Sequence, residues 1–285
     1  MAERTRKQNG NWVQVGDDGL PVQDVGVWAL DKHRYLENYI KASSGPRGTF
    51  LKPRGDGYQP AGAGFVDLFA GPGRARIRET SEFIAGSTIL ALEHDRQPFT
   101  KVVAVDLDEE NVTALRARTA KYGARANVLA GDCNLIIDEV IRRVPEYGLN
   151  LALIDPYGLE PLHFETLRRL AELQRMDLII HFPIADMKRN ILHEDNRENY
   201  QRFIDRFLGK HVEITHLSDV PRLIDVLRAQ LQPYGYQQEQ VRSVSVCNSK
   251  NAPLYYLVYI SKHPKGSEIW QSLARNTGKQ RGFRF

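Results

Sequence analysis

Short apolar runs alternate with stretches of helical periodicity through the middle of the chain. The runs are bounded by polar or glycine-rich segments, as expected for buried strands, and cover residues 65–69, 102–106, 127–130, 151–154 and 178–182. Between them, apolar residues recur at helical spacing over residues 87–93, 109–122, 136–144 and 167–173. Alternating strands and helices with short connections predict an α/β fold with a doubly wound, mostly parallel sheet.

The last third of the chain has a different pattern. Residues 196–208 and 220–231 have helical spacing, and residues 240–247 alternate between apolar and polar positions. A second β-rich run covers residues 253–261, with a polar turn at 248–251 between the two runs. This spacing predicts an antiparallel hairpin at the carboxyl end of the sheet.

The pattern before the first strand predicts an arm, a helix and a loop. Residues 1–25 are expected to be a flexible amino-terminal arm, and residues 28–41 a helix. A loop rich in glycine and proline then runs from Ser43 to Gly64. We expect residues 26–285 to form one domain, with a helical insertion at about 184–216.

Composition narrows the class of protein only slightly. The chain has 285 residues and a net charge of +4, which permits a polyanionic partner without requiring one. No apolar run approaches the roughly 18 residues that cross a bilayer, and the polar first residues do not resemble a secretory signal. Two cysteines, Cys133 and Cys247, give neither a metal-binding spacing nor a disulfide framework. These features predict a cytoplasmic protein without a metal site.

Aspartates end the first four strands of the series, at positions 67, 106, 132 and 155. Because the carboxyl ends of parallel strands meet at one edge of a sheet, we expect Asp67, Asp106 and Asp132 to converge on one groove. The turn Ala70–Gly73, which follows the first strand, has small residues that let a ligand lie against the backbone. It matches neither G-x-G-x-x-G nor a P-loop, which disfavours a pyrophosphate ligand.

The three acids match the parts of S-adenosylmethionine in chain order. Asp67 suits the cationic amino-acid end, Asp106 the ribose hydroxyls, and Asp132 the exocyclic amine of adenine. The flanking residues Phe69, Gly71, Gly73, Leu107 and Cys133 complete the predicted cofactor set, with Cys133 as a small buried residue. Taken singly, each aspartate is equally well explained as the N-cap of a helix.

A stiff turn, Asp155-Pro156-Tyr157-Gly158, follows the fourth strand. Pro156 fixes the backbone and leaves outward carbonyl groups, Asp155 can accept hydrogen bonds from an amine, and the Tyr157 ring can stack on a planar base. Acceptors beside a stacking face suit methylation of an exocyclic nitrogen, so Asp155, Pro156 and Tyr157 are the predicted catalytic residues. The same tetrapeptide also occurs as an ordinary turn.

With these motifs in place, the sequence resembles class I S-adenosylmethionine-dependent methyltransferases. The resemblance implies a seven-stranded sheet with an antiparallel last strand. A narrower resemblance, from about Trp28 to Phe285, is to the three-Cys-motif partner protein family, often written TcmP. It rests on Lys32 and Tyr39 in the first helix and on the segments DLFAGPGR, GST, DPYG, HFPIADMKRN and GKQRGFRF. It implies a separate protein partner that carries three cysteines.

Departures from the methyltransferase pattern leave alternatives open. Residues 74–85 are inserted before the first sheet helix, and the arginines there could close over the cofactor or contact an anionic substrate. The turn at Asp155 is not the Asn/Asp-Pro-Pro-Tyr/Phe of many amino-methyltransferases, and no Pro-Cys nucleophile supports a cytosine-C5 mechanism. The alternatives are a catalytically silent methyltransferase-like binding protein and a nicotinamide-dependent oxidoreductase, the latter disfavoured by the missing G-x-G-x-x-G.

Overall fold

The computed structural model describes residues 5–6, 12–53, 55, 58–191, 194–213, 220–237, 241–247 and 253–281. The chain divides into two compact units. The first contains Met1–Ile136 and Arg142–Asn150, and the second contains Ile137–Ile141 and Leu151–Phe285. We describe each unit separately, and the single domain predicted over residues 26–285 stays a prediction.

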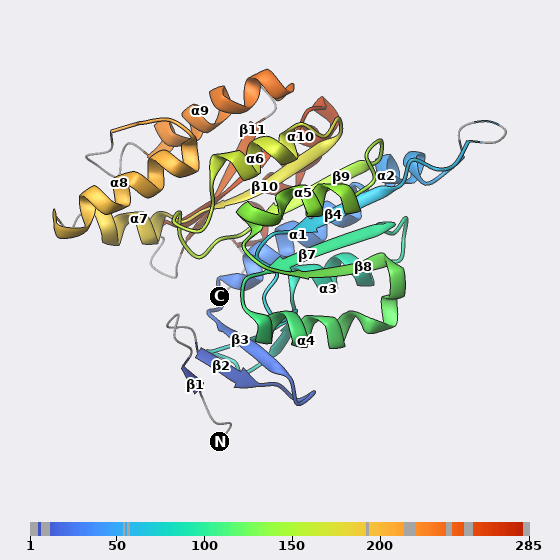
Figure 1. Ribbon diagram of the computed structural model, residues 1–285, viewed down its shortest axis with the longest axis horizontal. Helices are drawn as coiled ribbons and strands as arrows, with labels where there is room; N and C mark the ends of the chain where they lie inside the picture. Colours follow the sequence, from blue (N-terminus) through green and yellow to red (C-terminus); the bar gives the residue numbers. More distant parts are fainter. Residues whose placement is uncertain are drawn as a thin grey trace. The chain divides into compact units, whose positions relative to one another are not determined.

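Seven strands form a mostly parallel sheet in the order β11-β12-β10-β9-β4-β7-β8 (Figure 1). The strands are β4 (Ala63–Asp67), β7 (Lys101–Asp106), β8 (Ala126–Ala130), β9 (Leu149–Ile154), β10 (Met176–Phe182), β11 (Val241–Cys247) and β12 (Pro253–Ile260). Strand β12 is antiparallel to both β10 and β11. The predicted α/β fold is therefore confirmed, including the antiparallel last strand, while the predicted turn at 248–251 lies outside the described residues.

Local sequence explains the elements of the sheet in the first unit. Strand β4 is buried at every position, and parallel pairs place Val66 beside Val103 and Val103 beside Asn127. Helix α3 (Ser87–Glu93) follows, and helix α4 (Glu109–Thr119) begins where the Asp108 side chain accepts hydrogen bonds from two backbone N–H groups. The predicted strands and helices between residues 63 and 130 are thus present with small shifts at their ends.

A second sheet in the first unit corrects two predictions. Its order is β1-β2-β3-β5-β6, from β1 (Thr5–Arg6), β2 (Trp12–Val15), β3 (Pro21–Val25), β5 (Arg74–Ile77) and β6 (Phe83–Ala85). The flexible arm predicted over residues 1–25 is wrong for β1, β2 and β3, which are strands, with a turn at residues 16–20 between β2 and β3. The arginine-containing loop is likewise a hairpin, with Arg74 paired with Asp17 and Arg76 bonded to Gln14 and Ser81. Both errors arise because β3 pairs with β5, about fifty residues away in the sequence.

The loop predicted from Ser43 to Gly64 also contains a helix, α2 (Ser44–Phe50), directly after α1 (Ala29–Ala42). Its glycines and proline disfavour a helix locally, but Arg47 holds the segment in place. The buried guanidinium donates to the carbonyl of Gln97 and to Ser43 Oγ, and lies 4.4 Å from the centre of the Phe99 ring. Burial lowers the pKa of Arg47 to about 10.

Helices α6 (Phe164–Ala171), α7 (Ile184–Ile191), α8 (Glu194–Leu208), α9 (Val220–Leu231) and α10 (Pro264–Arg281) belong to the second unit. Helices α7 and α8 occupy the region predicted as a helical insertion. Helix α10 was not predicted; its Trp270 is fully buried and stacks on Tyr259 with ring centres 5.0 Å apart. Within the described residues, none of the helices combines the length and apolar character that crossing a membrane requires.

Candidate functional site

The turn after β4 requires glycine at two positions. Gly71 and Gly73 have φ angles of 59° and 81°, in the left-handed region that other residues rarely adopt. A Cβ atom on Gly73 would lie 2.5 Å from Leu115 Cδ1, and the Gly73 carbonyl accepts a 2.8 Å hydrogen bond from the Gly86 N–H. The turn is therefore held against α4 and the start of α3, with no side chain of its own at either glycine.

Asp106 joins this turn to the end of β7. Its Oδ2 accepts the Gly71 N–H at 2.7 Å, and its Oδ1 accepts from the Asp108 N–H and from Asn111 Nδ2. The Asp106 carbonyl also accepts the Gly131 N–H at 3.1 Å. The structure thus brings the glycine turn, Asp106 and the turn after β8 together at the carboxyl edge of these strands.

Asp132 begins helix α5 (Cys133–Arg143) in the manner of an N-cap. Its Oδ1 accepts from the backbone N–H and the side-chain amide of Asn134, at 2.8 and 2.7 Å. Its Oδ2 makes no hydrogen bond to any residue that the structure describes. The adjacent Cys133 is buried, and burial together with the Asp132 charge raises the pKa of its thiol to about 12. Burial and the raised pKa both favour a protonated thiol that packs in the interior.

Apolar side chains lie exposed next to these acids. Leu107, directly after Asp106, is 74% exposed, whereas Phe69 is half-buried. Leu135, in the first turn of α5, is 83% exposed and was missed by the sequence reasoning. The helical spacing of α5 places Leu135 opposite the inward-facing apolar residues, and this apolar residue on the polar face was the signal in the sequence. Exposed leucines beside a carboxylate provide apolar surface that a planar base can cover.

Asp67 differs from the other two acids, because it is fully buried. Its Oδ2 accepts from Ser87 Oγ at 2.6 Å and from Thr88 Oγ1 at 2.8 Å, so that it fastens the first turn of α3 to the end of β4. This geometry gives Asp67 a positioning role in the fold, and its predicted contact with a ligand stays a prediction. Asp106 and Asp132 lie at the sheet edge, as expected.

In the second unit, the turn after β9 is anchored by a residue that the sequence reasoning did not single out. His181 on β10 has its Nδ1 3.1 Å from the Pro156 carbonyl oxygen and 3.6 Å from Asp155 Oδ1. A carbonyl can only accept, so Nδ1 carries the hydrogen. The Pro156 carbonyl is thus engaged within the protein, and Tyr157 in the same turn is 62% exposed.

A second acid lies against the same turn. A Cβ atom on Gly158 would lie 2.9 Å from Asp186 Oδ2, which also accepts a 2.8 Å hydrogen bond from the Tyr200 hydroxyl. Burial and the Asp186 charge raise the pKa of Tyr200, which therefore stays a neutral donor. The segment HFPIADMKRN contains His181 and Asp186, but its sequence alone does not show that both reach the turn at 155–158.

Comparison with known proteins gives no family assignment: the sequence matches no protein-family profile and no curated protein. Among solved structures, the chain aligns with M. jannaschii TYW2 in complex with AdoMet at 11% identity and a TM-score of 0.43, over 92% of this chain and 85% of that one. It aligns with the methyltransferase domain of bacterial CtHen1-C at 15% identity and a TM-score of 0.40, over 80% of this chain and 98% of that one. It also aligns with the bifunctional kinase-methyltransferase WbdD at 15% identity and a TM-score of 0.44, over 82% of this chain and 39% of that one. At such low identities and scores, the function has to be argued from the residues of this chain.

Proposed function

We propose that this protein is an S-adenosylmethionine-dependent methyltransferase. The observation that carries the proposal is the hydrogen bond from the Gly71 N–H to Asp106 Oδ2, which fixes a carboxylate beside a turn with glycine at two of its four positions. An ionised carboxylate accepts about four hydrogen bonds, and Asp106 receives three from the protein. It therefore retains capacity for a ribose hydroxyl.

The other groups at this edge suit the remaining parts of the cofactor. Oδ2 of Asp132 has no hydrogen bond within the described residues and can accept from an exocyclic amine, and the exposed Leu107 can cover the face of a base. Two carboxylates would repel a pyrophosphate, which disfavours a nicotinamide dinucleotide. When bound, S-adenosylmethionine supplies an activated methyl group on a positively charged sulfur.

The second unit carries the proposed acceptor residues. Asp155 would accept a hydrogen bond from the amine that is methylated, and the exposed Tyr157 ring would stack on its planar group. His181 and Asp186 would hold the turn that presents them. These features favour a nitrogen of a nucleic acid base, or of a similar planar group, as the methyl acceptor.

A protein partner forms part of the proposal. The resemblance to the three-Cys-motif partner protein family implies that the chain works with a separate protein bearing three cysteines. Nucleic acid as a substrate is compatible with the net charge of +4. A cytoplasmic location stays a prediction.

Transfer of labelled methyl groups tests this function. The protein is incubated with labelled S-adenosylmethionine and total tRNA, rRNA or DNA, with and without a candidate three-cysteine partner. We expect label in one nucleic acid fraction, lost in Asp155→Ala and retained in Glu160→Ala, a substitution of an exposed acid in the same loop. If no label is transferred to any fraction, with or without the partner, a nucleic acid is not the methyl acceptor.

A catalytically silent binding protein is the second candidate. It is favoured by the turn Asp155-Pro156-Tyr157-Gly158, which is not the Asn/Asp-Pro-Pro-Tyr/Phe of many amino-methyltransferases. In that case S-adenosylhomocysteine would bind without turnover, and Asp155→Ala would leave the protein's function intact. Loss of methyl transfer in Asp155→Ala with unchanged binding of S-adenosylhomocysteine would eliminate this candidate.

A further inference from the structure

Strand β3 of the second sheet runs beside the chain that leaves the glycine turn. It pairs in parallel with β5, which begins at Arg74, immediately after Gly73. In this register Gln23 lies opposite Ala75, two residues beyond the turn. The amino-terminal part of the chain is thereby brought to the proposed cofactor site, although it is about fifty residues away in sequence.

The side chain of Gln23 lies over the glycine turn. Its Oε1 is 3.3 Å from the position that a Cβ atom on Gly71 would take. The side chain is half-buried, and within the described part of the chain its carboxamide makes no hydrogen bond. Because Gln23 is only half-buried, its amide donors and its carbonyl acceptor stay accessible to a ligand over Gly71.

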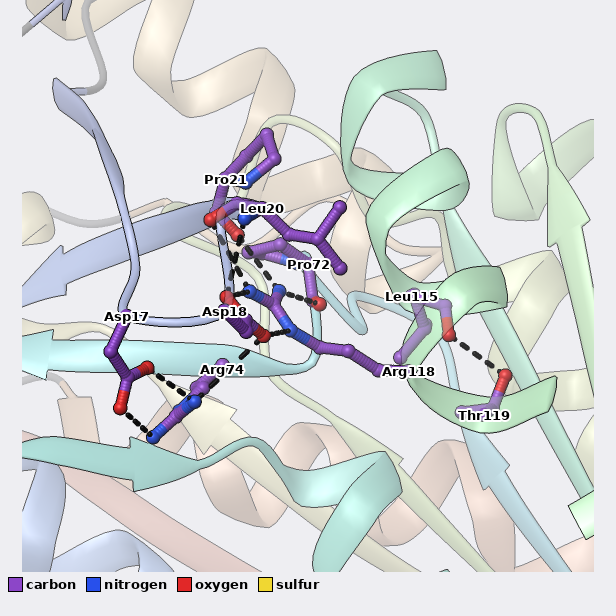
Figure 2. A network of polar contacts seen from close by, with 9 residues as sticks. All are labelled: Asp17, Asp18, Leu20, Pro21, Pro72, Arg74, Leu115, Arg118 and Thr119. Atoms are coloured by element: carbon purple, nitrogen blue, oxygen red, sulfur yellow. Dashed lines mark hydrogen bonds and ion pairs between the residues drawn. The ribbon is translucent and has the colours of Figure 1, made fainter. Parts of the chain in front are cut away.

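A clamp centred on Arg118 of α4 fixes this arrangement (Figure 2). The Arg118 side chain is 8% exposed; its Nη1 donates to the carbonyl of Pro72 at 2.6 Å and to that of Pro21 at 2.8 Å. The same guanidinium bonds to both oxygens of Asp18, in the turn before β3. Arg118 thus holds the glycine turn and the start of β3 together, and Gln23 follows Pro21 by two residues.

We propose that Gln23 is a cofactor-binding residue, which contacts the amino-acid end of S-adenosylmethionine over Gly71. This inference rests on the function proposed above. A carboxamide has two N–H donors and one carbonyl acceptor, so it can bond to both a carboxylate and an ammonium group. With Asp67 buried against Ser87 and Thr88, Gln23 takes over the contact that the sequence assigned to that acid.

Two ligands that differ only at this end test the assignment. S-adenosylhomocysteine has the amino-acid end, whereas 5′-methylthioadenosine retains the base, ribose and sulfur without it. Both are titrated calorimetrically into the full-length wild-type protein, Gln23→Ala and Gln14→Ala. Gln14 lies on the neighbouring strand and bonds to Arg76, so it is a control of the same residue type. Thermal unfolding of each variant checks that it is folded.

We expect Gln23→Ala to lower the affinity for S-adenosylhomocysteine about tenfold, which is the effect of losing a hydrogen bond to a charged group. The affinity for 5′-methylthioadenosine should not change. Gln14→Ala should bind both ligands like the wild type. Equal affinities of Gln23→Ala and wild type for S-adenosylhomocysteine, or equal weakening of both ligands, would overturn the assignment while the proposed function stands. A folded wild type that binds neither ligand would overturn the proposed function itself.

Discussion

The Arg118 guanidinium donates a 2.6 Å hydrogen bond to the carbonyl oxygen of Pro72, inside the glycine turn (Figure 2). Because Arg118 also pairs with Asp18, one nearly buried side chain connects helix α4, the glycine turn and the turn before β3. The shape of the proposed cofactor site therefore depends on a residue that is not expected to touch the ligand.

Replacing Arg118 should destabilise the fold. Arg118→Leu leaves Asp18 and three carbonyls without their donor, and we expect the free energy of unfolding to fall by about 2–4 kcal/mol. Urea denaturation of the wild type and the variant measures this loss. Arg116→Leu, on the same helix, removes only hydrogen bonds to the Val128 carbonyl near the surface and should cost about 1 kcal/mol or less. Equal losses in the two variants would contradict the proposed clamp.

Two histidines should affect the pH dependence of stability in opposite directions. Burial and the nearby Arg47 charge lower the pKa of His94 in the folded state, so the unfolded chain takes up a proton more readily and stability falls as pH drops below about 6.5. The hydrogen bond to Asp205 raises the pKa of His211, which adds stability below about pH 6.5 that is lost as pH rises through the folded-state value.

Urea denaturation between about pH 5 and 8 separates the two effects. His94→Gln should lose less stability than the wild type on acidification, and His211→Gln should lose more. Parallel pH profiles for both variants and the wild type would show that neither histidine has the assigned environment.

The charge of Asp67 should matter for the stability of the fold but not for ligand binding. Asp67→Asn keeps the shape of a residue bonded to Ser87 and Thr88, so the folded variant should be less stable but bind S-adenosylhomocysteine with wild-type affinity. Calorimetry on variants whose folding is verified by circular dichroism tests this. A large loss of affinity in folded Asp67→Asn would restore the ligand contact that the sequence predicted.

The pattern of apolar residues predicted the sheet because its strands are defined locally. Strands β4 and β7 are continuous apolar runs next to turn residues, and Asp108 marks the start of α4 as an N-cap. Strand β3 and helix α2 could not be predicted in this way, since β3 depends on pairing with distant β5 and α2 on the burial of Arg47. Interactions between distant segments overrode local propensity in both cases.

Part of the geometry of the candidate site follows from local sequence. Aspartates at strand ends marked the carboxyl edge of the sheet, and Asp106 does join the glycine turn there, while the roles of these residues toward a cofactor stay predictions. The sequence could not show that Asp67 is buried against Ser87, nor that Gln23 reaches Gly71 from another sheet. Each of these depends on which way a side chain points after segments far apart in the sequence have packed.

Binding of S-adenosylhomocysteine tests the central claim, that Asp106 and the glycine turn hold a sulfur nucleoside. In a calorimetric titration we expect the wild-type protein to bind at micromolar concentrations, with a free energy of about −7 to −9 kcal/mol. Folded Asp106→Ala should bind more weakly by about 1–3 kcal/mol, because the ribose hydroxyls lose their acceptor. Absence of binding to the wild type, or equal affinity in folded Asp106→Ala, would contradict the claim.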